Sequence, residues 1–323
     1  MLREIGGYFE LELNQGREYY PDLIALNSAR NALVYLLKSK KIAAINMPYF
    51  NCHVVADAVK RFCPNTIMHY YHVDEQFKPI LDDVTCDGPL YYVNYYGLQD
   101  HVVRSLSNYY LIIDNSQAFY SQPIPDGDTI YCPRKFFGVC DGGYLKSGAT
   151  LDGSLLHDTS WERAGYLLKR IDNGAAAAYS DYQAADAALS SKPLAKMSHL
   201  TQKILSNVDY ESVKKKRRYN FKYLHRHLGA KNGLLSLIKS ASKENAFVPF
   251  CYPYMTDDAE DLQERLIREK IYVPTYWPEL KESWDLNEYE KRFICKIVCL
   301  PIDQRYDEKD MAYIINIVNG FKK

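Results

Sequence analysis

Short apolar runs alternate with helical patterns between about residues 22 and 147. A helix is predicted over 29–38, because its apolar side chains recur on one face, and Ser28 precedes it as a suitable N-cap. The same spacing predicts a helix over 54–61. The shorter apolar runs predict buried strands at 42–47, 66–73, 90–96, 110–115, 129–132 and 144–146. This alternation predicts an α/β fold, in which helices cover both faces of a mostly parallel sheet.

The second half of the chain has a different pattern. Residues 156–206 are rich in Ala, Ser and polar residues and are predicted to be helical, and a long helix with a basic face follows over 208–228. Beyond it we predict strands at 246–252 and 295–300, and helices at 257–269 and 308–318. We therefore expect a large α/β domain over 1–207, with an N-terminal arm over 1–20, and a small C-terminal α+β domain over 208–323.

Composition and charge narrow the function classes. Lys plus Arg and Asp plus Glu both number 40, so no general attraction to nucleic acid or to an anionic membrane is expected. The basic run 214–218 is interpreted as a solvated helix face. No apolar run has the length of a membrane span, and the N-terminus lacks the apolar core of a signal peptide, so we expect a cytoplasmic protein. The eight cysteines form no Cys-x-x-Cys pair and are expected to be reduced thiols without a metal site.

Three segments carry candidate chemistry. Residues 26–33 form a loop that enters a helix, and the free amides of a helix N-terminus bind phosphate. Residues 111–118 place Asp114 at the carboxyl end of a strand, where open α/β sheets bind ligands. Residues 132–143 place Lys135 after a short strand and before a glycine pair. Each segment alone has an ordinary explanation as a helix cap or a solvated side chain, but their order and spacing together are more specific.

In this order the segments resemble the DegT/DnrJ/StrS-type sugar aminotransferases, which are pyridoxal-phosphate (PLP) enzymes of fold type I. That family has a strand that ends in Asp-x-x-Gln, and a lysine followed seven and eight residues later by Gly-Gly. Asp114 and Gln117 keep the first spacing, and Lys135 with Gly142 and Gly143 keeps the second. The resemblance implies the fold-type-I PLP-dependent transferase fold.

The resemblance also implies a role for each matching residue. PLP acts as an electron sink, and the protein positions and tunes it. Lys135 would form the Schiff base and move the proton between substrate and cofactor. Asp114 would keep the pyridine nitrogen protonated, and Gln117 would contact the side of the ring that bears the hydroxyl. The amides of Ala29 and Arg30 would cradle the phosphate.

Several positions depart from the family pattern. Arg30 replaces a threonine of the phosphate loop, and its side chain could pair with phosphate or point to solvent. Ile130 stands where the family usually has a serine, five residues before the lysine. Cys52 occupies the position of the aromatic residue that stacks on the cofactor ring. Residues 174–186 do not reproduce the loop that reaches into the partner subunit's site.

The resemblance implies a PLP-dependent aminotransferase that converts a keto-sugar, expected to be nucleotide-linked, to an amino-sugar with an amino-acid donor. Lysine at position 135 favours amino transfer, because the family's sugar-dehydrating members have histidine there. A homodimer with the active site at its interface is expected, and the 29 tyrosines are compatible with a large buried contact. Two alternatives remain: a degenerate PLP-fold protein that binds without turnover, and a PLP enzyme acting on a different amine.

Overall fold

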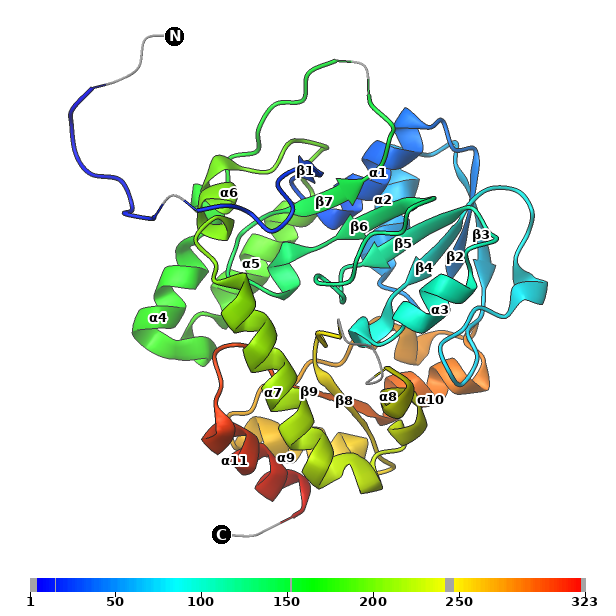
Figure 1. Cartoon of the computed structure of the whole chain (residues 1–323), viewed down its shortest axis with the longest axis vertical. Helices are drawn as coiled ribbons and strands as arrows, with labels where there is room; N and C mark the ends of the chain where they lie inside the picture. The colour runs from blue at the N-terminus through cyan, green and yellow to red at the C-terminus, as the bar shows by residue number, and fades with distance from the viewer. Residues whose placement is uncertain (1–4, 15, 152, 242–246, 321–323) are drawn as a thin grey trace.

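A seven-stranded sheet forms the centre of the larger part of the molecule (Figure 1). The computed structural model describes residues 5–14, 16–151, 153–241 and 247–320. The strands run in the order β1-β7-β6-β5-β4-β2-β3. β2 to β6 are parallel, whereas β7 runs antiparallel to both β6 and β1, which confirms the predicted mostly parallel sheet. The strands are β1 (Ile24–Leu26), β2 (Ala44–Pro48), β3 (Ile67–Tyr71), β4 (Leu90–Val93), β5 (Leu111–Asn115), β6 (Asp128–Tyr131) and β7 (Gly143–Lys146).

Burial explains why the central strands have continuous apolar runs. Every residue of β4, β5 and β6 is buried, as expected of parallel strands that are covered on both faces. Helix α1 (Ala29–Ser39) is buried from Asn31 to Leu37, and α2 (His53–Phe62) packs against it. The short helix α3 (Asp100–Ser105) was not predicted.

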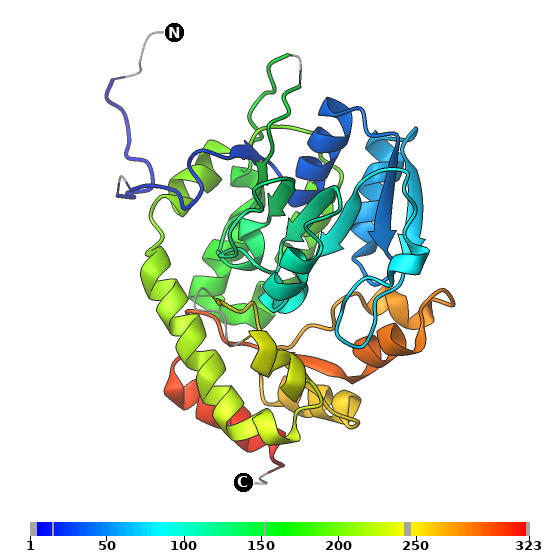
Figure 2. The same ribbon diagram turned by 45° about the vertical axis from the view of Figure 1, so that its right-hand side comes forward.

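The remaining helices follow the sheet in sequence. They are α4 (Gly165–Ala177), α5 (Tyr179–Ser190), α6 (His199–Leu205), α7 (Tyr210–Leu228), α8 (Leu235–Ala241), α9 (Ala259–Arg268), α10 (Glu288–Lys296) and α11 (Glu308–Val318). The antiparallel strands β8 (Tyr252–Met255) and β9 (Ile297–Leu300) lie among α7 to α11, below the large sheet in Figure 1. Figure 2 shows residues 5–12 extending away from the rest of the molecule, whereas Tyr20, nearer to β1, is buried.

One apolar core links the two parts of the chain. The rings of Phe77, which follows β3, and Phe293 of α10 stack with their centroids 3.9 Å apart. Phe50 packs against both rings and against Trp277. The domain boundary at residue 207 stays a prediction.

Two predicted strands begin in the wrong place. β8 begins at Tyr252, whereas the prediction covered 246–252; residue 246 lies outside the described residues, and 247–251 form no strand. The predicted strand 295–300 begins inside α10, which continues directly into β9. In the described part of the chain, no helix has both the length and the apolar character needed to cross a membrane.

Candidate active site

The carboxyl ends of the parallel strands bring the predicted residues together. Cys52 follows β2, Asp114 is the penultimate residue of β5, and Lys135 ends the 3₁₀ turn Pro133–Lys135 that follows β6. The sheet changes its strand order beside β2, because β3 lies on one side of it and β4 on the other. Ligands of open α/β sheets bind at such a switch point, outside the carboxyl ends of the strands.

Asp114 is held by two hydrogen-bond donors. Its side chain is buried, the Tyr91 hydroxyl donates to Oδ2 at 2.6 Å, and the amide of Ser116 donates to Oδ1 at 2.7 Å. Burial, and then the neighbouring Asp114 carboxylate, raise the pKa of Tyr91, so Tyr91 is a protonated donor. These bonds fix the direction of the carboxylate and leave oxygen lone pairs for a cationic partner.

Gln117 has a buried donor that no described residue accepts. Its Oε1 accepts a hydrogen bond from the backbone amide of Tyr96 at 2.7 Å, so the side-chain amide has a defined orientation. Its Nε2 has no partner within the described part of the chain, although the residue is only 1% exposed. A buried amide donor without an acceptor costs free energy, and an acceptor on a bound group would satisfy this one.

The N-terminus of α1 is built as a helix cap. Ser28 has extended backbone angles, and its Oγ accepts a hydrogen bond from the amide of Asn31 at 3.1 Å, which confirms the predicted N-cap. The first helical hydrogen bond runs from the Ala32 amide to Ser28 O. The amides of Ala29 and Arg30 precede that bond, at the positive end of the helix dipole.

The glycine pair allows the cap and the lysine turn to meet. A Cβ atom on Gly143 would lie 2.4 Å from the carbonyl carbon of Ser28 and 2.5 Å from the nitrogen of Ala29. Gly142 has a φ of +122°, and a Cβ there would lie 2.9 Å from Pro133 Cγ in the turn that carries Lys135. Both positions therefore require glycine, and the spacing between Lys135 and the pair has a steric cause.

Cys52 lies close enough to Lys135 for their side chains to interact electrostatically. Burial raises the pKa of the Cys52 thiol, while the nearby positive charge of Lys135 lowers it. Lys135 itself is half-buried. A sulfur atom at this position can contact a ring, but it offers no aromatic face for stacking.

The Arg30 side chain contacts helix α5. Its guanidinium donates to Ser190 Oγ at 3.0 Å, at the end of α5. Burial lowers the pKa of Arg30, and the charge of Asp186 on α5 opposes that effect. Arg134 pairs with the same Asp186 at 2.9 Å. Helix α5 therefore lies against the turn Pro133–Lys135. From the sequence, this region was noted only because residues 174–186 do not reproduce the family's loop.

A polar network behind the cap was not predicted. Asn27 donates to Asp158 at 3.3 Å, and Asp158 pairs with Arg163 at 2.8 Å in a buried ion pair. Asn31 donates to Asn27 Oδ1 at 2.7 Å. The four-residue spacing of Asn27 and Asn31 could have indicated their contact from the sequence. No sequence spacing indicates the contact with Asp158.

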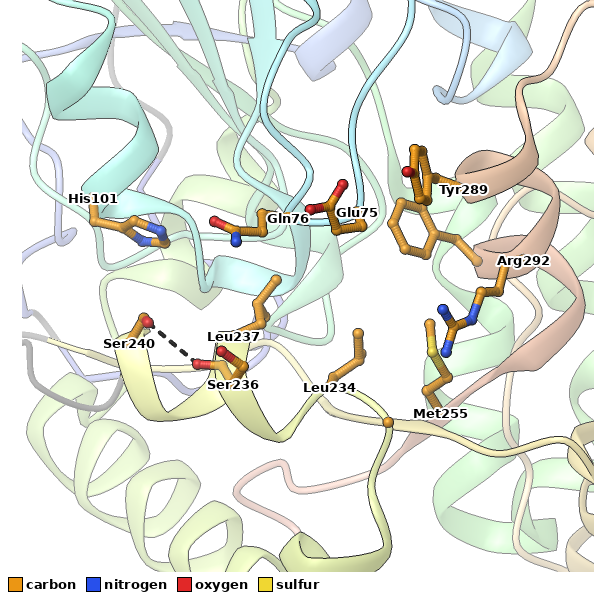
Figure 3. A pocket seen from close by; sticks show the side chains of 12 residues that line it. Glu75, Gln76, His101, Leu234, Ser236, Leu237, Ser240, Met255, Tyr289 and Arg292 are labelled. Atoms are coloured by element: carbon orange, nitrogen blue, oxygen red, sulfur yellow. Dashed lines mark hydrogen bonds between the residues drawn. The ribbon is translucent and has the colours of Figure 1, made fainter.

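A separate cavity of about 220 Å³ opens away from these residues. Figure 3 shows Glu75 and Gln76 facing α8 across it, with Tyr289 and Arg292 of α10 at one side. None of the predicted site residues lines this cavity.

Comparison with known proteins finds similarity only at the level of structure. No family model and no curated protein matches the chain. DesV from S. venezuelae superposes with a TM-score of 0.60 at 16% identity, covering 91% of this chain and 83% of that one. This is the fold of the type I aminotransferases. The sequence resemblance is thereby confirmed for the fold.

Two further solved structures show the same similarity. A DegT DnrJ EryC1 StrS aminotransferase from Brucella abortus has a TM-score of 0.60 at 14% identity, covering 93% of this chain and 85% of that one. The putative sugar aminotransferase Spr1654 from Streptococcus pneumoniae has a TM-score of 0.62 at 12% identity, with coverage of 91% and 84%. A second structure of Spr1654 is described as its PMP form.

Proposed function

We propose that this protein is a PLP-dependent aminotransferase that converts a keto-sugar, in nucleotide-linked form, to an amino-sugar with an amino-acid donor. The buried Asp114 carboxylate, with its two donors, and the unpartnered Nε2 of Gln117 support the proposal, because one group held by Lys135 would satisfy both side chains. The sugar as substrate is supported by the printed names of the structural neighbours, such as the sugar aminotransferase CalS13 from Micromonospora echinospora.

The residues present fit the cofactor. Lys135 would hold it through the ε-amine, Asp114 would face its pyridine nitrogen, and Gln117 Nε2 would donate to the ring hydroxyl oxygen. The N-terminus of α1 offers backbone amides and a positive dipole end to the phosphate. When bound, the cofactor supplies an electron sink for cleavage of bonds at the substrate carbon.

The protein's own contribution is positioning and proton transfer. A neutral Lys135 amine can accept a proton from the substrate carbon and return it to another position, since amines act as general bases. Asp114 would hold a proton on its partner nitrogen, because its charge, fixed by Tyr91 and Ser116, favours a cation opposite it. The pairing of Arg134 with Asp186 keeps the lysine turn against α5.

Borohydride reduction in the presence of PLP tests the cofactor assignment. We expect a stable adduct on Lys135, located by peptide mass spectrometry, and no adduct in Lys135→Ala. The variant should remain folded by circular dichroism, because Lys135 is only half-buried. A protein that takes up no PLP under these conditions contradicts the enzyme proposal.

Binding without turnover is the second candidate function. The observation in its favour is that Arg30, at a position of the phosphate loop, is bonded to Ser190. Incubation of the PLP-loaded protein with glutamate distinguishes the two candidates. An aminotransferase releases 2-oxoglutarate and keeps the amino group on the cofactor, whereas a binding protein leaves both unchanged.

We also propose that the protein works as a homodimer. Large apolar side chains are exposed on the region from residue 156 to α5 and on the N-terminal arm, and such patches mark contact surfaces. They include Leu156, Trp161, Leu168 and Ile171, and Ile5, Tyr8 and Phe9 of the arm. Sedimentation at low micromolar concentration should give a dimer, and Ile171→Asp should weaken it. A wild-type monomer that turns over substrate contradicts a shared site.

A further inference from the structure

A thiol, an imidazole and a carboxylate meet at the start of α2. Cys52 is the N-cap of this helix, His53 is its first residue, and Glu279 comes from the 3₁₀ turn Pro278–Glu282 of the C-terminal part. One potential ligand atom from each of the three lies within 4.8 Å of the others. His53 Nδ1 and Glu279 Oε1 are 2.5 Å apart.

This group has the composition and spacing of a transition-metal site. Bond lengths typical of zinc place the sulfur, nitrogen and oxygen ligands of a tetrahedral ion roughly 3.4–3.6 Å apart. The His53–Glu279 pair would have to separate by roughly 1 Å, which rotation of an exposed carboxylate allows. Three protein ligands leave a fourth position for water, and solvent reaches the site because the side chain of His53 is 55% exposed.

A further carboxylate lies beside His53, which a simple pair of His53 with Glu279 would not need. Asp57, one helical turn after His53, has its Oδ2 3.9 Å from Nε2. An ion at Nδ1 would leave the Nε2 proton to Asp57, the arrangement by which a carboxylate orients a metal-bound histidine.

We propose that Cys52, His53 and Glu279 bind a divalent transition-metal ion of the Zn²⁺ type, with Asp57 as the positioning residue for His53. The proposed amino transfer does not require this ion, although the two sites share Cys52. The bound ion would join α2 to the turn Pro278–Glu282. Because Cys52 also lies close to Lys135, the ion and PLP would exclude each other.

Co²⁺ is the probe for this site. Titration of the full chain, freed of metal and cofactor, should show one Co²⁺ per chain, with the visible bands of tetrahedral Co²⁺ and a near-ultraviolet thiolate band. Cys52→Ser should remove the thiolate band and weaken binding at least tenfold. Asp57→Asn should keep the band and weaken binding about 10-fold or more, as loss of an orienting carboxylate does. PLP at saturating concentration should prevent Co²⁺ binding to the wild type.

The control is Cys86→Ser, which removes an exposed cysteine outside the cluster. It should bind Co²⁺ like the wild type. The proposal is overturned if the wild type binds no Co²⁺, if its spectrum has no thiolate band, or if Cys52→Ser binds unchanged. Glu279→Gln tests the ligand that comes from the turn Pro278–Glu282. If this variant binds Co²⁺ with wild-type affinity, Glu279 is not a ligand. Failure of Co²⁺ binding leaves the borohydride result on Lys135 unaffected, so the two proposals are separable.

Discussion

Replacement of Gly143 by alanine perturbs the junction between the helix cap and the sheet. The added Cβ would lie 2.4 Å and 2.5 Å from backbone atoms of Ser28 and Ala29, whereas carbon atoms in contact prefer about 3.5–4.0 Å. The backbone at the start of α1 must therefore move by about 1 Å. The φ of Gly143 lies outside the left-handed region, so the cost is steric rather than conformational.

The magnitude follows from overpacking. Such insertions cost about 1–3 kcal/mol. An unfolding entropy of about 2.1 cal/mol/K per residue over 323 residues converts this cost to a melting temperature lower by about 1.5–4.5 °C. If the shifted amides also bind the phosphate, a loss of about 1.4 kcal/mol would raise the Kd for PLP tenfold.

Thermal melting and PLP titration measure both effects. Gly148→Ala is the matched control, because its Cβ would meet no atom within 4 Å. We expect this control to melt and bind like the wild type. If Gly143→Ala also does so, the close packing of α1 on β7 and its role in phosphate binding are both wrong.

Three further results are expected. Asp114→Asn should retain PLP but lower turnover at least 100-fold, about 2.7 kcal/mol, because an amide cannot hold the proton on the ring nitrogen; near-normal turnover would exclude the assignment. Tyr91→Phe removes one hydrogen bond to Asp114 and should lower turnover about 5- to 10-fold with little change in PLP content; steady-state kinetics checks this. Burial raises the pKa of Asp303, but hydrogen bonds and charge from Arg305, with the charge of Arg217, outweigh burial and hold the pKa below its usual value. A carboxylate whose pKa is lowered on folding stabilises the protein above about pH 4 and loses that contribution as the pH falls. Asp303→Asn should therefore show a smaller loss of unfolding free energy between about pH 5 and pH 3 than the wild type, measured in urea. Equal slopes would show that the pair with Arg305 does not contribute.

Local patterns were enough to predict most of the sheet and its helices. Burial of one face over 29–38 predicted α1 to within one residue, and the polar residue before it was its cap. The strands from β2 to β7 lie within or next to the predicted runs, because a central strand must be apolar along its whole length. Helices α8 and α10 were missed because they have only seven and nine residues, so a helical period has few turns over which to appear.

The candidate site was predicted only where its residues are close in sequence. Asp114 lies three residues before Gln117, and Lys135 lies seven and eight residues before the glycine pair. The donor to Asp114 comes from β4, and the partner of Arg30 lies 160 residues away on α5. No sequence spacing relates such pairs.

The sequence by itself determined which segments are buried and where α1 begins. These features depend on neighbouring residues and on the periods of helix and strand. Only the tertiary structure decided that Tyr91 donates a hydrogen bond to Asp114 and that Arg30 and Arg134 donate to residues of α5. It also decided that Glu279 contacts His53, 226 positions away in the sequence. Such contacts form when distant segments are packed together to bury apolar surface, so the side chains that meet are decided by the packing of the whole chain and not by local spacing.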